Sequence, residues 1–257
     1  MTYTSTLPAV ARSRGRWMRQ LWRLPTGRFG IIVVACVALV ALVSLFWTPY
    51  DPKTVDLAAR WVLPSLQHPL GTDGTGRDIL TLIMGGARTT MFVAIGSGII
   101  ASVVGIVLAS LGALTPRWTR ESMAVLIDIL IAFPVLLIAM MISSVWGGSL
   151  WVVIWSVGIG FGVSIARVTR PELRRVLHSD FILAARASGL SDMQILWRHL
   201  LPNVAPVFIV QLSWSMAVAV LAEAGLSYLG YGASPTEPSW GVLLANLQAY
   251  IAIHPLA

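Results

Sequence analysis

Five long stretches with almost no charged residue constrain this sequence more than any other feature. They span residues 29–47, 90–114, 122–142, 146–166 and 204–226. A helix needs about 20 mostly apolar residues to cross roughly 30 Å of hydrocarbon, and only helices and closed barrels satisfy their backbone polar groups in lipid. The sequence therefore predicts an all-α, polytopic bundle of transmembrane helices with five visible spans. The tail at residues 242–257 is too short and too mixed to count as a sixth.

The composition supports lipid as the main solvent of this chain. Charged residues make up 11% of it and hydrophobic residues 56%, whereas soluble domains carry roughly a quarter charged residues. The first apolar stretch follows an arginine-rich segment, as in a signal peptide, but it is longer than a signal-peptide core and lacks a small-residue cleavage site. We interpret it as a membrane anchor. Cys36 is the only cysteine, which excludes a disulfide framework and a cysteine-rich metal site.

The arginines predict how the bundle lies across the membrane. The formal charge is +7, which suggests a nucleic-acid partner in a soluble protein but basic cytoplasmic loops in a membrane protein. Fourteen arginines lie in the tail 1–28 and in two loops, against four basic residues on the opposite side. The positive-inside rule therefore places the N-terminus and the loop 167–203 in the cytoplasm. The four residues left outside are Lys53, Arg60, Arg77 and Arg88.

Small residues recur along the second stretch at the spacing of a helix face. One row consists of Ala101, Gly105, Ala109 and Ala113, and a second of Ala94, Gly98 and Ser102. In lipid, such rows let neighbouring backbones come close where no hydrophobic effect drives association. We therefore expect this helix to pack tightly in the bundle. In the third stretch, Pro134 removes one backbone hydrogen bond and frees the carbonyl of Leu130.

One compact polar insert, residues 179–203, interrupts the apolar pattern. Residues 180–188 suit a short helix with Ser179 as N-cap and Gly189 as a left-handed terminator. A second helix starts with a capping box formed by Ser191 and Gln194. Pro202 is expected to end the unit. The second helix carries an apolar stripe that consists of Met193, Leu196, Trp197 and Leu200.

Three interpretations fit this insert. A DNA-binding helix-turn-helix has a similar outline, but the loop is too short for such a domain and its second helix is apolar, so no nucleic-acid partner is expected. An amphipathic connector that lies on the membrane is a second option. The third is a pair of helices that passes a partner's movement to the neighbouring spans, because a capped, rigid element transmits a push that a flexible loop absorbs.

The residue spacing in the insert resembles a known motif. Leu183-Ala184-Ala185 is followed after three residues by Gly189 and, nine residues later, by a segment from His199 to Pro202. This pattern resembles the EAA loop of ABC-transporter permeases, which docks on a cytoplasmic ATPase. The resemblance implies a coupling loop at 167–203. The implied contact residues are Leu183, Ala184, Ala185, Gly189, Ser191, His199, Leu201 and Pro202, with Leu183 replacing the family's usual Glu and His199 its Ile.

Further segments resemble permeases for dipeptides and oligopeptides. HPLGTDGTGRDILTLIMGGARTTM at residues 68–91 and LAEAGLSYLGYGASPTEPSWGVLL at residues 221–244 are similar to segments of that family, as is IDILIAFP at residues 127–134. The resemblance is to the second permease subunit, the DppC/OppC type, and nickel permeases share the pattern. It implies a type I ABC importer permease domain over residues 29–257, with a sixth span beyond the five that are visible.

The resemblance also implies partners and a location. The chain would form half of the translocation pathway of an ATP-driven importer for dipeptides or oligopeptides, or for nickel or another small solute. The implied partners are a homologous second permease, two ATPase subunits or domains that bind ATP and Mg²⁺, and an extracytoplasmic substrate-binding protein. No catalytic residue, metal or cofactor is implied for this chain itself. The implied location is the bacterial cytoplasmic membrane, with lipid around the spans.

A glycine-rich segment at residues 71–78 nearly matches a phosphate-binding loop. Arg77 stands where such a loop has lysine, and the carboxylate of Asp78 replaces a magnesium-binding hydroxyl and repels phosphate. The predicted topology also places the segment outside the cell. We therefore expect a turn in which Asp73 or Thr75 caps a short interfacial helix. Asp73, Arg77 and Asp78 are candidates for contact with the second permease or the binding protein.

Two acids, Asp128 and Glu223, fall within predicted spans. A charged side chain at the bilayer centre costs about 2.5–3.5 kcal/mol on insertion scales, so each acid should face protein or a water-filled path. We hypothesise that both lie near the translocation pathway or at a helix contact, with local hydrogen bonding as the alternative. The four histidines, His68, His178, His199 and His254, show no metal-ligand spacing.

An ion-coupled secondary transporter is the main rival class. Such a transporter is expected to have inverted repeats and broken helices in both halves. The five spans and the single polar hairpin of this sequence show neither feature. A channel subunit is disfavoured because no stretch resembles a selectivity filter.

Overall fold

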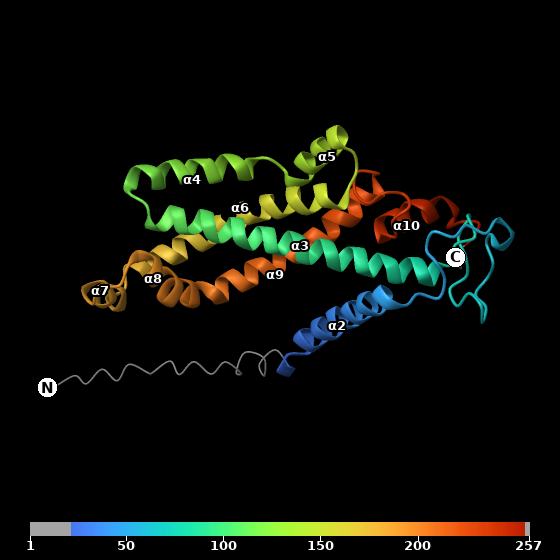
Figure 1. Ribbon diagram of the computed structural model, residues 1–257, viewed down its shortest axis with the longest axis horizontal. Helices are drawn as coiled ribbons and strands as arrows, with labels where there is room; N and C mark the ends of the chain where they lie inside the picture. The colour runs from blue at the N-terminus through green and yellow to red at the C-terminus, as the bar shows by residue number, and fades with distance from the viewer. Residues whose placement is uncertain (1–21, 255–257) are drawn as a thin grey trace.

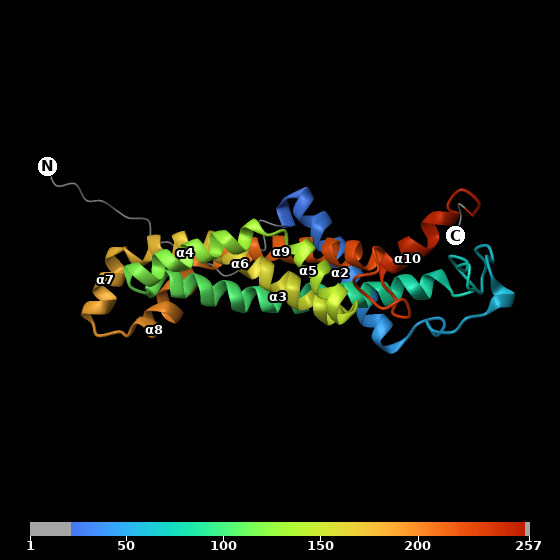
Figure 2. The same cartoon turned by 90° about the horizontal axis from the view of Figure 1, so that it is seen from above.

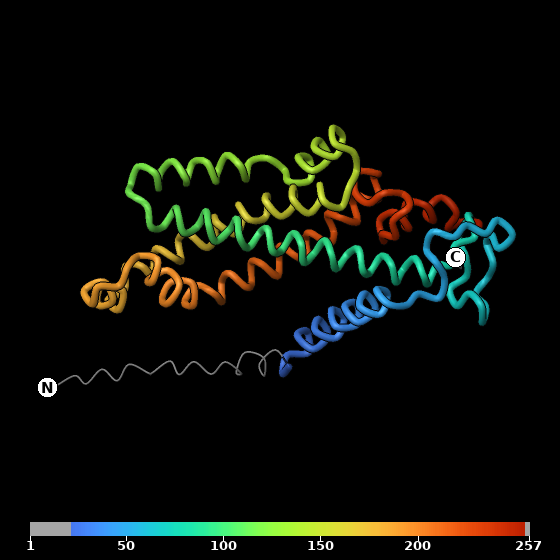
Figure 3. Tube along the Cα trace, in the orientation of Figure 1, coloured from blue at the N-terminus to red at the C-terminus, as the bar shows by residue number. Residues whose placement is uncertain are grey.

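The computed structural model of this chain describes residues 22–254. Its helices run along one long axis, so the bundle is elongated (Figure 1; Figure 3). In chain order the helices are α2 (Pro25–Phe46), η1 (Leu57–Ala59), α3 (Ile79–Leu114), α4 (Arg117–Ala132), α5 (Val135–Trp146), α6 (Leu150–Leu177), α7 (Asp180–Ala187), α8 (Asp192–Ile195), η2 (Leu196–Leu200), α9 (Leu201–Tyr228), α10 (Trp240–Leu247) and η3 (Gln248–Tyr250). No strand forms within these residues, in agreement with the predicted all-α fold.

The predicted spans correspond to helices, with corrected boundaries. Among residues 22–254, four helices are long and apolar enough to cross a membrane, and the number is five if a bent pair of helices counts as one span. The helix of the second span begins at Ile79, eleven residues before the predicted span, and it continues through Gly85, Gly86 and Arg88, which lower its apparent hydropathy. The helix of the fourth span extends to Leu177, beyond the predicted end at residue 166, since its basic continuation still buries one apolar face.

The third predicted span is broken rather than straight. It consists of α4 and α5, whose axes differ by 73° across the break. Phe133 and Pro134 both have extended backbone at this point. A proline lacks the amide hydrogen and disfavours helical backbone in the residue before it. Pro134 therefore does more than free one carbonyl, because it redirects the chain.

The core of the bundle lies where α3 packs against α6 and α9. The predicted row of small residues on α3, from Ala101 to Ala113, is buried there. A Cβ atom on Gly105 would come within 2.7 Å of Ile165, and one on Gly162 of α6 within 2.6 Å of Val104. The close approach of these two helices therefore depends on glycines from both, which confirms the tight packing expected from the sequence.

The bundle has two distinct ends (Figures 1 and 2). At the hairpin end, residues 178–203 fold into α7, α8 and η2. At the loop end, the connection 47–78 lies near α10. Helices α6 and α9 both start or finish in the hairpin and extend toward the loop end, so they join the two. Most of the predicted basic tail, residues 1–28, lies outside the described residues.

Candidate functional site

The turn of the hairpin is defined by backbone geometry at Gly189. This residue has φ +81°, and open space surrounds the position of a Cβ atom. The amide of Gly189 donates to the carbonyl of Arg186 (2.9 Å), and the amide of Leu190 donates to that of Ala185 (3.2 Å). These two bonds form a Schellman motif that ends α7. The prediction of Gly189 as the helix terminator is therefore confirmed.

The second helix of the hairpin starts with the predicted capping box. The amide of Ser191 donates to the side-chain oxygen of Gln194 (2.9 Å), and the amide of Gln194 donates to the Ser191 hydroxyl (3.4 Å). Arg186 pairs with Asp192 across the turn at 3.2 Å. Both side chains of this pair are exposed, so it adds only about 0–1 kcal/mol of stability. The turn is thus fixed mainly by its backbone caps.

Two local predictions for the hairpin are corrected. Ser179 occupies the N-cap position of α7, but its hydroxyl donates to the carbonyl of Val176 (2.6 Å) instead of accepting from α7. Pro202 does not end the unit, because the helix continues from η2 into α9. The π turn of η2 makes room for the ring, which in a regular α-helix clashes with the carbonyl four residues earlier. The side-chain amide of Asn203 donates to the carbonyl of His199 (2.6 Å).

Buried side chains join the hairpin to the spans on either side. Ile182 of α7, Ile195 of α8 and Leu200 of η2 are fully buried. They share one apolar cluster with Leu173 of α6 and Val204 of α9. Since protein interiors are close-packed, a displacement of the hairpin must move α6 and α9 with it. The hairpin is therefore a rigid extension of two spans rather than a loop between them.

The outer surface of the hairpin is apolar and exposed. The predicted stripe divides, because Leu196 and Leu200 are buried whereas Met193 and Trp197 are each 62% exposed. Next to them, Phe181 and Leu183 are also exposed, and the Phe181 ring lies 6.3 Å from that of His199. Among the implied contact residues, those exposed are Leu183, Ala184, Gly189, Ser191 and Pro202, and those partly buried are Ala185, His199 and Leu201.

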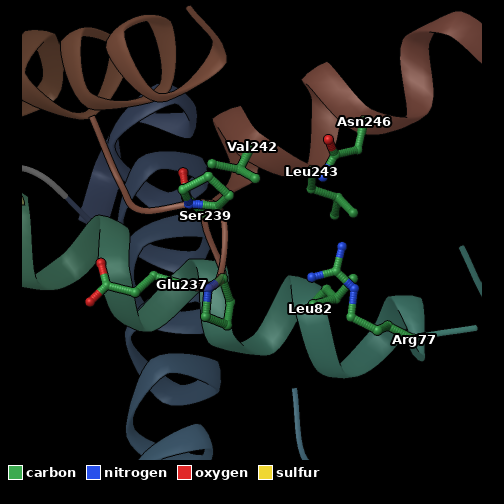
Figure 4. A pocket seen from close by; sticks show the side chains of 9 residues that line it. Arg77, Leu82, Glu237, Ser239, Val242, Leu243 and Asn246 are labelled. Carbon is green, nitrogen blue, oxygen red and sulfur yellow. The ribbon is translucent and has the colours of Figure 1, made fainter. Parts of the chain in front are cut away.

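At the loop end, Asp73 organises the glycine-rich turn. One of its carboxylate oxygens accepts from the amide of Thr75 (2.8 Å) and from the amide of Arg77 (3.0 Å). The other pairs with the Arg77 guanidinium at 3.1 Å. Asp73 is buried, so these bonds compensate its desolvation. The guanidinium itself lies between α3 and α10, opposite Leu243 and Asn246 (Figure 4).

Asp78, rather than Asp73 or Thr75, caps the helix that follows the turn. Its carboxylate accepts from the amide of Thr81 (2.8 Å), and the helix it caps is the long α3 rather than a short interfacial one. The other oxygen lies 3.0 Å from Nδ1 of His68. Because a single helix contains both the cap and the second span, the loop end is directly anchored to the bundle.

The two intramembrane acids lie in different environments. Glu223 on α9 is fully buried, and its Oε1 accepts hydrogen bonds from the hydroxyls of Ser227 and Ser239, both at 2.7 Å. Its Oε2 has no hydrogen-bond partner in the described part of the chain. Asp128 on α4 is 65% exposed in its side chain and lies 3.8 Å from Arg167 of α6. The structure does not bring the two acids together.

Sequence reasoning missed the partners of both acids. Arg167 immediately follows the fourth apolar stretch, where it was counted only as a loop arginine. Ser239 lies sixteen residues after Glu223, and only the folded chain brings the two together. Among residues 22–254, no three His, Cys, Asp or Glu side chains gather as a metal site.

Comparison with known proteins places this arrangement in a family. The sequence profile described as "Binding-protein-dependent transport system inner membrane component" matches residues 101–255. A protein named as a peptide transport system permease of Brucella suis biovar 1 is 33% identical over 232 residues, which cover 90% of this chain and 78% of that protein. The nickel transport system permease protein NikC of Escherichia coli is 31% identical over 230 residues, covering 89% and 83%.

A solved structure shares the fold. The MetNI methionine ABC transporter in an inward-facing conformation aligns with a TM-score of 0.56 and 20% identity, over 68% of this chain and 83% of that chain. At 20% identity, the structural similarity to this transporter supports only a shared fold. The family profile and the two relatives together cover the hairpin, the core helices and the segment around Glu223. The chain belongs to the family of binding-protein-dependent transport system inner membrane components and is a permease subunit of an ABC importer of the DppC/OppC type.

Proposed function

We propose that this chain forms half of the translocation pathway for dipeptides or oligopeptides and that its hairpin receives the movement of an ATPase subunit. The observation that supports this most is the construction of the hairpin. The turn between α7 and α8 is closed by a Schellman motif and a capping box, and the hairpin shares one apolar cluster with α6 and α9. It also presents exposed apolar side chains. An exposed apolar patch on a rigid element is typical of a protein interface.

The proposed orientation places the hairpin in the cytoplasm and the loop end outside the cell. Basic residues concentrate around the hairpin and the α3–α4 connection, as the positive-inside rule requires for the cytoplasmic side. The ATPase subunits then meet α7 and α8, and the substrate-binding protein meets the loop end around Asp73, Arg77 and Asp78. A homologous second permease completes the pathway, and ATP and Mg²⁺ are bound by the ATPase subunits.

Asp128 and Arg167 support a pathway between two permeases. Both side chains are more than half exposed in this chain, and their separation of 3.8 Å makes a loose ion pair. Charges of this kind are costly in lipid, so this face should meet protein or water in the assembled transporter. We propose that it faces the pathway or the second permease. For the fully buried Glu223, a local hydrogen-bonding role agrees better with its contacts.

Peptides are the proposed substrates because relatives from Brucella suis that align with about nine tenths of this chain are named as peptide permeases. Nickel is the second candidate, supported by the similarity to the nickel permease of Escherichia coli. Uptake of radiolabelled dialanine and of ⁶³Ni²⁺ by proteoliposomes that hold the whole transporter and its binding protein separates the two. Dialanine uptake that depends on ATP supports the proposal, and nickel uptake alone contradicts it.

A large side chain introduced on the hairpin tests whether the hairpin docks on the ATPase subunits. Ala184 is exposed on α7, so a tryptophan there leaves the bundle intact but obstructs a docked partner. We expect Ala184→Trp to lower co-purification of the ATPase subunits at least about tenfold, as the loss of about 1.4 kcal/mol of binding energy would. Thr119→Trp, at the exposed start of α4, is the matched control and should co-purify normally. Equal recovery of the ATPase with both variants would argue against docking at α7.

A further inference from the structure

A pocket of about 240 Å³ lies between α2, α3, the start of α6 and the segment that precedes α10. Leu45, Phe92 and Leu150 give it an apolar lining. Two residues of opposite charge, Arg88 and Glu237, also line it. This combination of one cation, one anion and an apolar wall has no place in the coupling mechanism.

Neither charge is neutralised by a neighbour. In the described residues, the ion pairs that form within 4.0 Å include neither Arg88 nor Glu237. The Glu237 side chain also extends away from the Arg77 guanidinium (Figure 4). Both charged groups are exposed and line the same hollow. They are therefore free to bind a ligand that carries both signs of charge.

The segment that supplies Glu237 is held firmly against α3. The hydroxyl of Thr89 donates to the carbonyl of Pro238 (2.6 Å), and the indole of Trp240 donates to the carbonyl of Ile83 (3.0 Å). A Cβ atom on Gly85 would lie 2.6 Å from the Pro238 ring, so this ring packs directly on the α3 backbone. The wall that α3 and α6 form is ordered as well, because the Phe92 ring packs edge-on against Trp151 at 5.3 Å. The pocket is thus preorganised.

Exposed tryptophans and the length of α3 indicate that the pocket lies near the level where the hydrocarbon of the bilayer ends. The charge-free part of the first span ends at Trp47, and Leu45 of this helix lines the pocket. Trp47 and Trp151 are each 61% exposed, and exposed tryptophans are typical of the membrane interface. The 36 residues of α3 measure about 54 Å, well above the roughly 30 Å of hydrocarbon, so Arg88 can lie at the interface.

We propose that this pocket binds the headgroup of a zwitterionic phospholipid of the phosphatidylethanolamine type. Arg88 binds the phosphate, for which guanidinium geometry is well suited, and Glu237 accepts hydrogen bonds from the primary ammonium. The first carbons of the acyl chains lie on Leu45 and Phe92. The pocket lies beside α2, which packs mainly on α3 at the edge of the bundle, outside the α3–α6–α9 core. A peripheral location of this kind suits a lipid better than a transported peptide.

The proposal is tested by lipid retention. The complete transporter, exchanged into detergent with equal amounts of phosphatidylethanolamine and phosphatidylglycerol, is examined by native mass spectrometry. We expect the wild type to retain phosphatidylethanolamine about tenfold better, the preference expected from one charge-assisted contact. Glu237→Gln should abolish this preference while some phosphatidylglycerol remains, and Arg88→Gln should lower the retention of both lipids. Phosphatidylcholine, whose trimethylammonium donates no hydrogen bond, should be retained less well.

The control pair is Arg117→Gln with Glu121→Gln, an exposed ion pair at 2.8 Å on α4 outside the pocket. These variants should retain lipid as the wild type does. If Arg88→Gln cannot be purified, Glu237→Gln and Arg88→Lys still test the proposal. Arg88→Lys keeps the positive charge that binds phosphate, so it should still retain both lipids. An unchanged lipid preference in Glu237→Gln contradicts the proposal. Release of the lipid by millimolar dialanine also contradicts it, because the pocket would then take peptide termini.

Discussion

Glu223 joins two segments of the chain that are distant in sequence. The two hydroxyls that donate to its Oε1 each accept a backbone amide in turn, that of Ala233 for Ser227 (2.9 Å) and that of Gly241 for Ser239 (3.1 Å). One carboxyl oxygen therefore organises the turn after α9 and the start of α10. Both hydroxyls and Oε1 are satisfied in this network, whereas Oε2 has no partner in the described part of the chain.

Substitutions at Glu223 should separate hydrogen bonding from charge. Glu223→Ala leaves two buried hydroxyls without their acceptor, at a cost of about 1–3 kcal/mol each, so the melting temperature of the purified chain should fall by several degrees. Glu223→Gln keeps the acceptor oxygen and should melt near the wild type. Glu121→Ala, at an exposed site, serves as the control. If Gln and Ala destabilise equally, the negative charge rather than the acceptor is required.

Asp128 is expected to act in transport rather than in folding. Its carboxylate is exposed, and its nearest cation, on Arg167, is 3.8 Å away. We expect Asp128→Asn to preserve the melting temperature but to lower the ATP-dependent uptake rate about tenfold, equivalent to about 1.4 kcal/mol in the barrier. Initial rates in proteoliposomes measure this. Uptake at the wild-type rate would remove Asp128 from the pathway.

At the scale of helices, two prolines differ in whether they interrupt the helix, although each lacks the same backbone hydrogen bond. Pro134 separates α4 from α5 with a bend of 73°, whereas Pro202 lies within a helix that continues from α8 to the end of α9. A widened π turn precedes Pro202 and relieves its clash, and the core cluster around Leu200 and Val204 holds the helix together. Local sequence marks where a break is possible, but packing decides whether it occurs.

The same distinction explains what the sequence could predict. The capping box of Ser191 and the terminator Gly189 depend on residues close in the chain, and they are confirmed. The apolar stretches also predicted helices correctly, apart from the bend in the third. The partners of Glu223 and the early start of α3 depend on contacts across the fold, which no periodicity reveals. The cap at Asp78 was missed because Asp73, five residues earlier, has the same chemistry.

The break at Pro134 should depend on the proline itself. In Pro134→Ala the missing hydrogen bond can form, and we expect α4 and α5 to straighten. Spin labels at residues 122 and 144 should then move apart by roughly 7 Å, estimated from a rise of 1.5 Å per residue and the bend of 73°. Electron-electron resonance measures this distance. An unchanged distance would mean that tertiary contacts, rather than Pro134, maintain the bend.

At the scale of the whole molecule, α6 and α9 connect the hairpin with the loop end. Their shared cluster with Ile182 and Ile195 fastens them to the hairpin, and the network at Glu223 fastens α9 to the segment before α10. We therefore expect a movement applied at one end to reach the other, as a rigid-body transition between two states requires. The glycines that let α3 approach α6 keep this core closely packed.

A photo-reactive amino acid at Met193 tests this account most directly, because the side chain is exposed on the hairpin. On illumination of the complete, membrane-embedded transporter, we predict a covalent product with an ATPase subunit. The same probe at Trp118, an exposed residue at the start of α4, should give little of that product. Labelling of phospholipid alone from Met193 would contradict the account. The hairpin would then rest on the membrane and would not contact an ATPase subunit.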